Sequence, residues 1–162
     1  MTKMTISQEG IDLIKEFEGC KLVAYKPVPT EKYFTIAWGH SGPDVKEGMK
    51  ITEAKADKLL MEDLKIFEKK INDVRVNLRQ NQFDALVSLI YNIGAGNFGS
   101  STLRQYIIGD RKDEEITDQI IRWCNAGGKP LTGLKRRRIA EANLFLGYER
   151  YTLDKDNNII KI

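Results

Sequence analysis

The sequence predicts an α+β fold, with a small hairpin lobe near the N-terminus and a larger helical lobe after it. Between Lys21 and Trp38, apolar and polar residues alternate with period two on either side of a proline-containing segment. After Thr52, apolar residues recur at spacings of three and four, the pattern of amphipathic helices. We expect one domain over residues 1–162, with the hairpin lobe at about 19–50, the helical lobe at about 51–147 and a tail at 148–162.

The first element is predicted to be a helix that begins after Ser7. Ser7 is a residue type that caps helix N-termini, and Ile11, Ile14 and Phe17 recur at helical spacing behind it. Gly19 follows this stripe, and glycine is the residue most often found just past a helix end. The predicted helix therefore ends immediately before Gly19.

The next element is predicted to be a short antiparallel hairpin. Val23 and Tyr25 lie at period two, and so do Tyr33 and Thr35. A polar, proline-punctuated segment separates the two pairs and predicts an irregular loop. Glycines between residues 39 and 48 predict a second loop.

Everything after Thr52 is predicted to be helical, except for the tail from residue 148, which the pattern does not assign. The apolar stripes that predict these helices are Leu60–Ile71, Phe83–Ile90, Leu103–Ile107, Ile116–Cys124 and Leu134–Leu146. Glycines close four of them, at 94–96, 109, 127–128 and 147.

Charge and hydropathy exclude several function classes. Lys and Arg number 26 against 23 Asp and Glu, and a net charge of +3 does not indicate a nucleic-acid partner. The basic run Lys135–Arg138 spreads around a helix, so we expect a mostly solvated helix with one or two salt bridges there. No apolar run approaches the roughly 18 residues of a membrane span, and residues 1–7 lack a signal peptide. We expect no stable membrane insertion and a protein made in a cytoplasm.

The cysteine and histidine content argues against a metal or cofactor. Cys20 and Cys124 lie far apart, without a CxxC pattern, and His40 is the single histidine. We expect no metal site and no cofactor. Two free thiols are the default, and whether the cysteines pair stays open.

Glu18 and Thr35 are the first candidates for chemistry. Glu18 lies at the C-terminal end of a predicted helix, where the partly negative helix dipole favours the protonated acid and so a proton donor. Taken alone, such a residue is more often a solvated glutamate. Thr35 lies in a predicted strand, where threonine is common for its β propensity.

His40 and Asn92 suit structural roles as well as functional ones. A lone histidine at the end of a hairpin is more often a hydrogen-bonding residue than a base, and Asp63 on the following helix is the carboxylate expected to hold it. Asn92 lies near a predicted helix end, where an amide suits a cap or a sugar contact equally.

Taken together, these residues resemble a known family. Glu18-Gly19, Tyr25-Lys26 and Thr35–His40 resemble the active-site hairpin of phage-type lysozymes, the endolysins or muramidases of glycoside hydrolase family 24. Further matching segments are Gln80–Ser88, Tyr91–Gly94, Ser100–Leu103, Arg122–Trp123, Ala126–Lys129 and Gly133–Arg138. The resemblance covers roughly Ile6 to Gly147 and implies a lysozyme-like fold with the active-site cleft between its two lobes.

The resemblance implies an endolysin that hydrolyses the β-1,4 bond between N-acetylmuramic acid and N-acetylglucosamine in peptidoglycan. Glu18 would protonate the glycosidic oxygen, and Thr35 would position the water or the opposite face of the sugar. Tyr91 and Asn92 would contact the sugar chain. Such a protein would be a monomer that stays in the host cytoplasm until a separate holin admits it to the wall.

One departure concerns the second catalytic group. The family carries an Asp between the Glu and the Thr, but here sixteen residues separate Glu18 from Thr35, two more than in the family. The expected Asp position falls on Pro27 or on Pro29, depending on the end from which it is counted. We favour Glu31 as the replacement, because the insertion could re-aim its side chain. Two alternatives stay open beside it: Glu18 acts with Thr35 and a water alone, or the protein binds glycan without cutting it.

The missing Asp also leaves alternative functions open. A lytic transglycosylase manages with one catalytic acid, because a hydroxyl of the muramic acid itself attacks. A non-catalytic wall-binding or membrane-perturbing protein is the other alternative. A second departure is Ala37-Trp38, which stands where the family usually has Gly-Tyr.

Overall fold

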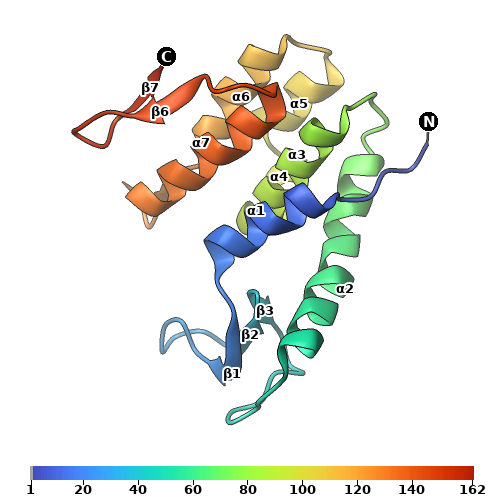
Figure 1. The fold of residues 1–162 in the computed structure, drawn as a ribbon, viewed down its shortest axis with the longest axis vertical. Coiled ribbons are helices and arrows are strands. Elements are labelled where there is room, and N and C mark those ends of the chain that lie inside the picture. The colour runs from blue at the N-terminus through green and yellow to red at the C-terminus, as the bar shows by residue number, and fades with distance from the viewer. Residues whose placement is uncertain (1) are drawn as a thin grey trace. The chain divides into compact units, whose positions relative to one another are not determined.

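The computed structural model describes residues 2–162 as a mixture of helices and small sheets, which confirms the predicted α+β class (Figure 1). The helices are α1 (Gln8–Glu18), α2 (Glu53–Asn72), α3 (Gln80–Ile93), α4 (Ala95–Gly99), α5 (Thr102–Ile108), α6 (Asp113–Ile121) and α7 (Thr132–Leu146). The strands are β1 (Lys21–Tyr25), β2 (Thr35–Ala37), β3 (His40–Ser41), β4 (Asn125–Ala126), β5 (Lys129–Pro130), β6 (Tyr151–Leu153) and β7 (Ile159–Lys161). None of the described helices is long and apolar enough to cross a membrane.

The chain divides into two compact units. The hairpin unit is Ile14–Ile66, and the helical unit is Phe67–Ile162 with the N-terminal residues to Leu13. Both boundaries fall inside helices, one in α1 and one in α2. The units therefore share two helices.

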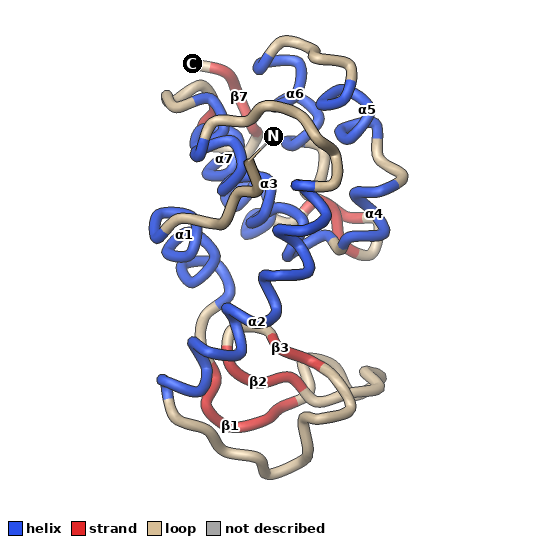
Figure 2. Tube along the Cα trace, turned by 90° about the vertical axis from the view of Figure 1, so that its right-hand side faces the viewer, coloured by secondary structure: helices blue, strands red, loops and turns tan. Residues whose placement is uncertain are grey.

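The hairpin unit contains a three-stranded antiparallel sheet in the order β1-β2-β3 (Figure 2). Thr35 of the central strand β2 lies opposite Tyr25 on one side and Ser41 on the other. The third strand, β3, was predicted to be loop, because two residues are too few for an alternation to show. The core of the unit is a cluster of buried residues, Ile36, Ala37, Val45 and Ala56.

The backbone is left-handed at two residues where β2 ends and turns towards β3. Gly39 has φ 103°, which glycine adopts at little cost, but Ala37 has φ 59°. Ala37 is also buried, at 2% exposure. A left-handed conformation costs an L-residue roughly 1–2 kcal/mol, so packing around Ala37 has to offset that strain.

The helical unit is built around α3. Its residues from Gln82 to Ile90 are all buried, and α7 packs against it and against α6 (Figures 1 and 2). This burial agrees with the apolar stripe that predicted the helix. The predicted glycine stop is also confirmed, because Gly94 follows the last residue of α3 with φ 94°.

The prediction that the residues between Thr52 and the tail are helical was wrong where one stripe ends. The stripe expected to reach Cys124 ends at Ile121, and the hairpin β4–β5 follows, turning at Gly127 and Gly128 with φ 58° and 78°. A further short helix, α4, begins at Ala95, inside the glycine segment 94–96 that was expected to close α3. The unassigned tail forms the hairpin β6–β7.

The C-terminal hairpin is anchored through Tyr151, which is buried at 3% exposure. Its hydroxyl is 2.8 Å from Thr117 Oγ1 and donates to Asp118 Oδ1 at 2.8 Å. Burial, reinforced by the Asp118 carboxylate, raises the pKa of Tyr151 to about 12. The hydroxyl therefore stays neutral and holds β6 to α6.

The expectation of a mostly solvated helix at Lys135–Arg138 was also wrong, because two of its arginines are buried. Arg137 is 3% and Arg138 0% exposed, and both form ion pairs with the fully buried Glu141 at 3.2 and 2.7 Å. Ser88 Oγ of α3 donates to the same carboxylate at 2.6 Å. Two residues of the basic run can be buried in the core because a buried carboxylate lies between their guanidinium groups.

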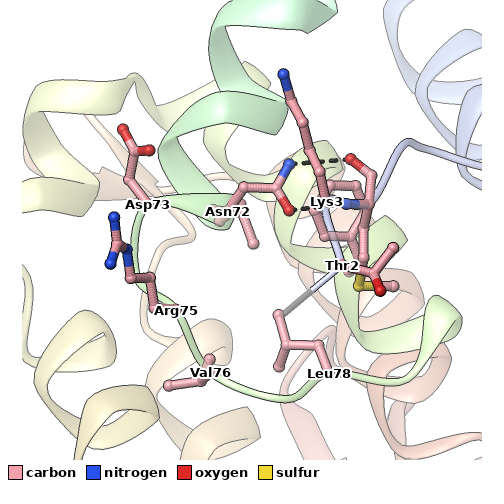
Figure 3. A pocket seen from close by; sticks show the side chains of 10 residues that line it. Thr2, Lys3, Asn72, Asp73, Arg75, Val76 and Leu78 are labelled. Carbon is pink, nitrogen blue, oxygen red and sulfur yellow. Dashed lines mark hydrogen bonds between the residues drawn. The ribbon is translucent and has the colours of Figure 1, made fainter.

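The N-terminal segment before α1 is tied to the helical unit by polar side chains. Asn72 bonds the backbone of Met4 through both amide atoms, at 3.0 and 2.9 Å (Figure 3). Ile6 N–H donates to buried Glu68 at 2.7 Å. Ser7, the expected N-cap, directs its hydroxyl to Asp84, and its N–H donates to the same carboxylate at 2.9 Å.

Candidate active site

Glu18 is the last residue of α1 and is half-buried. The helix ends there because Gly19 adopts a left-handed conformation, φ 67°, and its N–H donates to Lys15 O at 3.2 Å. The carboxyl group therefore belongs to the partly negative end of the helix dipole, as the sequence predicted. Glu18 is thereby placed at a fixed helix end, directly before β1.

Thr35 is the first residue of β2, the central strand of the hairpin-unit sheet, and is half-buried. Strand β1 begins three residues after Glu18 and pairs with β2. Glu18 and Thr35 therefore belong to the same compact unit and are joined by one strand pair. An acid and a hydroxyl supported in this way have the rigid backing that catalytic groups need.

Glu31 lies in the exposed connection between β1 and β2. Its N–H donates to Val28 O at 3.1 Å, which makes a tight turn, and its side chain is exposed. Pro27 and Pro29 precede it in the same exposed connection. A carboxylate at this position can be reached by solvent and by a large polymeric substrate.

His40 is held between two carboxylates. Its Nδ1 is 2.7 Å from Asp63 Oδ2, the residue expected to hold it, and its Nε2 is 2.8 Å from Asp44 Oδ2. Burial lowers the pKa of His40, but the hydrogen bonds to Asp44 and Asp63 outweigh it, so the pKa is raised. Both ring nitrogens are engaged, which suits a structural cation better than a general base.

Asp44 was missed by the sequence reasoning. It follows a Gly-Pro turn that brings Val45 N–H to Gly42 O at 3.1 Å, and this turn directs the carboxylate back towards His40. The spacing of four residues between His40 and Asp44 is the one signal that could have indicated the pair. Contact with His40 lowers the pKa of Asp44.

Tyr91 and Asn92 lie at the C-terminal end of α3 in the helical unit. Tyr91 packs edge-on against Phe67, with ring centroids 5.4 Å apart. Asn92 is exposed, and its Oδ1 accepts a hydrogen bond from Arg138 Nη2 at 2.7 Å. The guanidinium fixes the orientation of the Asn92 amide.

The remaining candidates are the two cysteines and a metal site. Cys20 and Cys124 are both half-buried free thiols, and burial raises the pKa of Cys20. Within residues 2–162, no group of three or more His, Cys, Asp or Glu side chains is placed to hold a metal ion.

Two cavities lie in the helical unit around Arg75, Val76 and Leu78, with volumes of about 380 and 300 Å³. Figure 3 shows the first, with Thr2 and Lys3 on one side and Asp73 and Arg75 on the other. Neither cavity is lined by a residue that the sequence predicted for the site.

Known proteins resemble this chain over most of its length. The endolysin of Bacillus phage B103 is 44% identical over 156 residues, which is 96% of this chain and 59% of that protein. The chain therefore spans less than two thirds of that endolysin. The muramidase domain of SpmX from Asticaccaulis excentricus matches with a TM-score of 0.80 and 36% identity, covering 88% of this chain and 97% of that domain.

A variant of P22 lysozyme matches with a TM-score of 0.76 and 40% identity, covering 88% of this chain and 99% of that one. The family model described as phage lysozyme matches residues 15–141, which include Glu18, Thr35 and the last turn of α1. The helices, the small sheets and these matches agree, and the chain belongs to the phage lysozyme family.

Proposed function

We propose that the chain is an endolysin that hydrolyses the β-1,4 bond between N-acetylmuramic acid and N-acetylglucosamine in peptidoglycan. The observation that carries the proposal is the pair Glu18 and Thr35, backed by the end of α1 and the central strand of one sheet. Membership of the phage lysozyme family supports it, since the matched residues include both groups.

In this proposal Glu18 is the general acid. It donates its proton to the glycosidic oxygen as the bond to the muramic acid C1 breaks, so that the N-acetylglucosamine leaves as an alcohol. Water adds to C1 and loses a proton, and Thr35 orients it through its hydroxyl. Glu31 accepts that proton, because its exposed carboxylate is carried on the loop where the family has its Asp.

Tyr91 and Asn92 contact the glycan, with Asn92 held in one orientation by Arg138. His40 and Asp63 keep the hairpin in place. The chain acts as a monomer that stays in the host cytoplasm until a separate holin gives it access to the wall.

A lytic transglycosylase is the second candidate, and Pro27 and Pro29 favour it. Proline occupies both positions at which an Asp is expected, and its side chain has no group that could activate water. An enzyme whose substrate hydroxyl attacks C1 needs no such group and would leave an anhydro-muramic end.

The experiment is mass spectrometry of purified peptidoglycan digested by the wild-type chain, with Glu18→Gln as control. Reducing N-acetylmuramic ends that disappear with the variant support hydrolysis. Anhydro-muramic ends would transfer the protein to the transglycosylases. If the folded wild-type chain released no sugar fragments, both catalytic hypotheses would be wrong and a non-catalytic wall-binding role would remain. Glu31→Gln, digested in parallel, loses most activity if Glu31 takes the proton and keeps it all if it does not.

A further inference from the structure

We infer that Lys15, Trp38 and Asp57 form a positioning cluster that fixes Glu18 relative to Thr35. The inference rests on the proposed function, because it assigns these three residues a role in that same reaction. None of them belongs to the acid, hydroxyl and carboxylate set named above.

The three side chains form a closed triangle. Lys15 Nζ lies 3.0 Å from Asp57 Oδ1, and Trp38 Nε1 donates to the same oxygen at 2.9 Å. Lys15 Nζ also lies 5.0 Å from the centre of the Trp38 ring, a cation–π contact. Each member therefore contacts the other two.

The triangle joins three elements of the hairpin unit. Lys15 comes from α1, Trp38 from the turn between β2 and β3, and Asp57 from the first turns of α2. These are the elements that carry Glu18 and Thr35, with α2 as their common support. A rotation of α1 or a shift of the turn would break at least two of the three contacts.

Lys15 is linked directly to the end of α1. It precedes Glu18 by three residues, so both side chains lie on one face of the helix. Its carbonyl oxygen accepts the hydrogen bond from Gly19 that closes the helix. Holding Lys15 therefore fixes the direction in which the last turn presents the Glu18 carboxyl.

Trp38 directly follows the strand that carries Thr35. It follows Thr35 by three residues and directly follows Ala37, whose left-handed backbone is disfavoured for an L-residue. The indole N–H bond to Asp57 and the contact with Lys15 hold the turn in that conformation. Ala37 and Trp38, which stand where the resemblance predicts Gly-Tyr, are therefore a strained residue and its anchor.

The exposure of the cluster's side chains indicates that the cluster positions Glu18 and Thr35 more than it stabilises the fold. The Asp57 side chain is 51% exposed and that of Lys15 is 26% exposed. Ion pairs this open to solvent contribute little to folding stability. Contact with Lys15, and then with Trp38, lowers the pKa of Asp57, so the carboxylate is charged at neutral pH. A small displacement of a catalytic group costs far more in rate than in stability.

The test compares Asp57→Ala, Trp38→Phe and Lys15→Arg on solubilised peptidoglycan, with kcat, KM and Tm measured for each. We expect Asp57→Ala to lower kcat about tenfold, with KM changed less than twofold and Tm lowered by less than about 2 °C. Trp38→Phe keeps a ring but loses the N–H donor, and is expected to lower kcat about threefold. Lys15→Arg keeps the positive charge and the contact with the Trp38 ring, and should retain most of kcat.

A matched control is the exposed ion pair of 2.9 Å between Lys69 of α2 and Asp73, the residue that follows α2, both outside the hairpin unit. Lys69→Gln should leave kcat unchanged. Wild-type kcat in both Asp57→Ala and Trp38→Phe, or losses of kcat no larger than the loss of folded protein, would overturn the inference. Full activity of Glu18→Gln would instead overturn the proposed function, and the inference with it. If Glu18→Gln is inactive while Asp57→Ala is fully active, the inference is wrong and the proposed function stands.

Discussion

At the scale of single residues, Ala37 carries the most unusual backbone in the candidate site. It is both left-handed and buried, with φ 59° and 2% exposure. Its methyl group packs with Ile36, Val45 and Ala56. A small side chain at this position is a compromise: glycine would relieve the strain, and the methyl group fills space in the core.

Two substitutions at Ala37 separate these effects. Ala37→Val places a β-branched side chain in left-handed backbone and overfills the cluster, so we expect a loss of about 2–3 kcal/mol in unfolding free energy. Ala37→Gly relieves the strain but loses a buried methyl and gains freedom in the unfolded chain, so it should change stability by less than about 1 kcal/mol. Urea unfolding followed by circular dichroism measures both. Equal losses in the two variants would contradict the assigned strain.

His40 predicts a pH dependence. Its pKa is raised in the folded state, so its ion pairs contribute fully below the unfolded pKa of about 6.5. That contribution is lost as pH rises through the folded pKa. His40→Gln should therefore cost about 2 kcal/mol at pH 5.5 and clearly less at pH 9. Urea midpoints of both proteins across this range test the prediction, and a cost independent of pH would exclude a charged His40.

At the scale of elements, α7 depends on its buried charges. Arg137 and Arg138 enter the core because Glu141 lies one turn away on the same helix and Ser88 completes the carboxylate shell from α3. Burial raises the pKa of Glu141, and the two guanidinium groups oppose that shift. The packing of α7 on α3 is therefore coupled to one carboxylate.

Glu141→Leu would leave two buried guanidinium groups without their counterion. Removing one partner of a buried ion pair costs about 3–5 kcal/mol, and this variant is expected to lie in that range or to fail to fold at 37 °C. Asp73→Ala, which breaks the exposed pair with Lys69, is the control and should leave the unfolding free energy close to that of the wild type. Chemical denaturation of both proteins at pH 7 provides the comparison, and similar costs would contradict the buried-charge argument.

At the scale of the whole molecule, two helices cross the boundary between the units. Neither unit can unfold without breaking α1 and α2 in mid-helix, and a shortened helix has lost part of its cooperative support. We therefore expect one unfolding transition for both units.

The two tryptophans report on the units separately, because Trp38 belongs to the hairpin unit and Trp123 to the helical unit. In the variants Trp123→Phe and Trp38→Phe, a single tryptophan remains in each case. Urea midpoints from fluorescence should coincide with the midpoint from circular dichroism of the same variant. Midpoints separated within one variant would show that the units unfold independently.

The sequence predicted the parts of the fold that depend on local periodicity. The stripe along α3 suffices to predict that helix, because apolar residues that recur at 3.6-residue spacing form one continuous face of a helix. The strands β3 and β4 escaped prediction because each has two residues and is defined by its partner. The burial of Arg137 escaped it because the compensating groups, Glu141 and Ser88, come together only in the tertiary structure.

For the candidate site, too, some residues could be placed from local sequence patterns and others could not. The positions of Glu18 and Thr35 follow from a helix end and a strand, both of which the sequence indicates. Glu31 lies in an exposed connection whose shape depends on a two-residue insertion, so spacing alone could not place it. Asp57 contacts Lys15 and Trp38 only in the folded chain, because the three residues come from separate elements. No sequence motif indicates such contacts.

The anchored N-terminal segment has a consequence for the order of synthesis. Met4, Ile6 and Ser7 bind partners that lie 68, 62 and 77 residues later in the chain. At about 5–20 residues per second, a ribosome delivers those partners roughly 3–15 s after the segment itself. The segment made early is therefore among the last to dock, and it waits in solvent, accessible to chaperones and proteases, until α3 has left the exit tunnel.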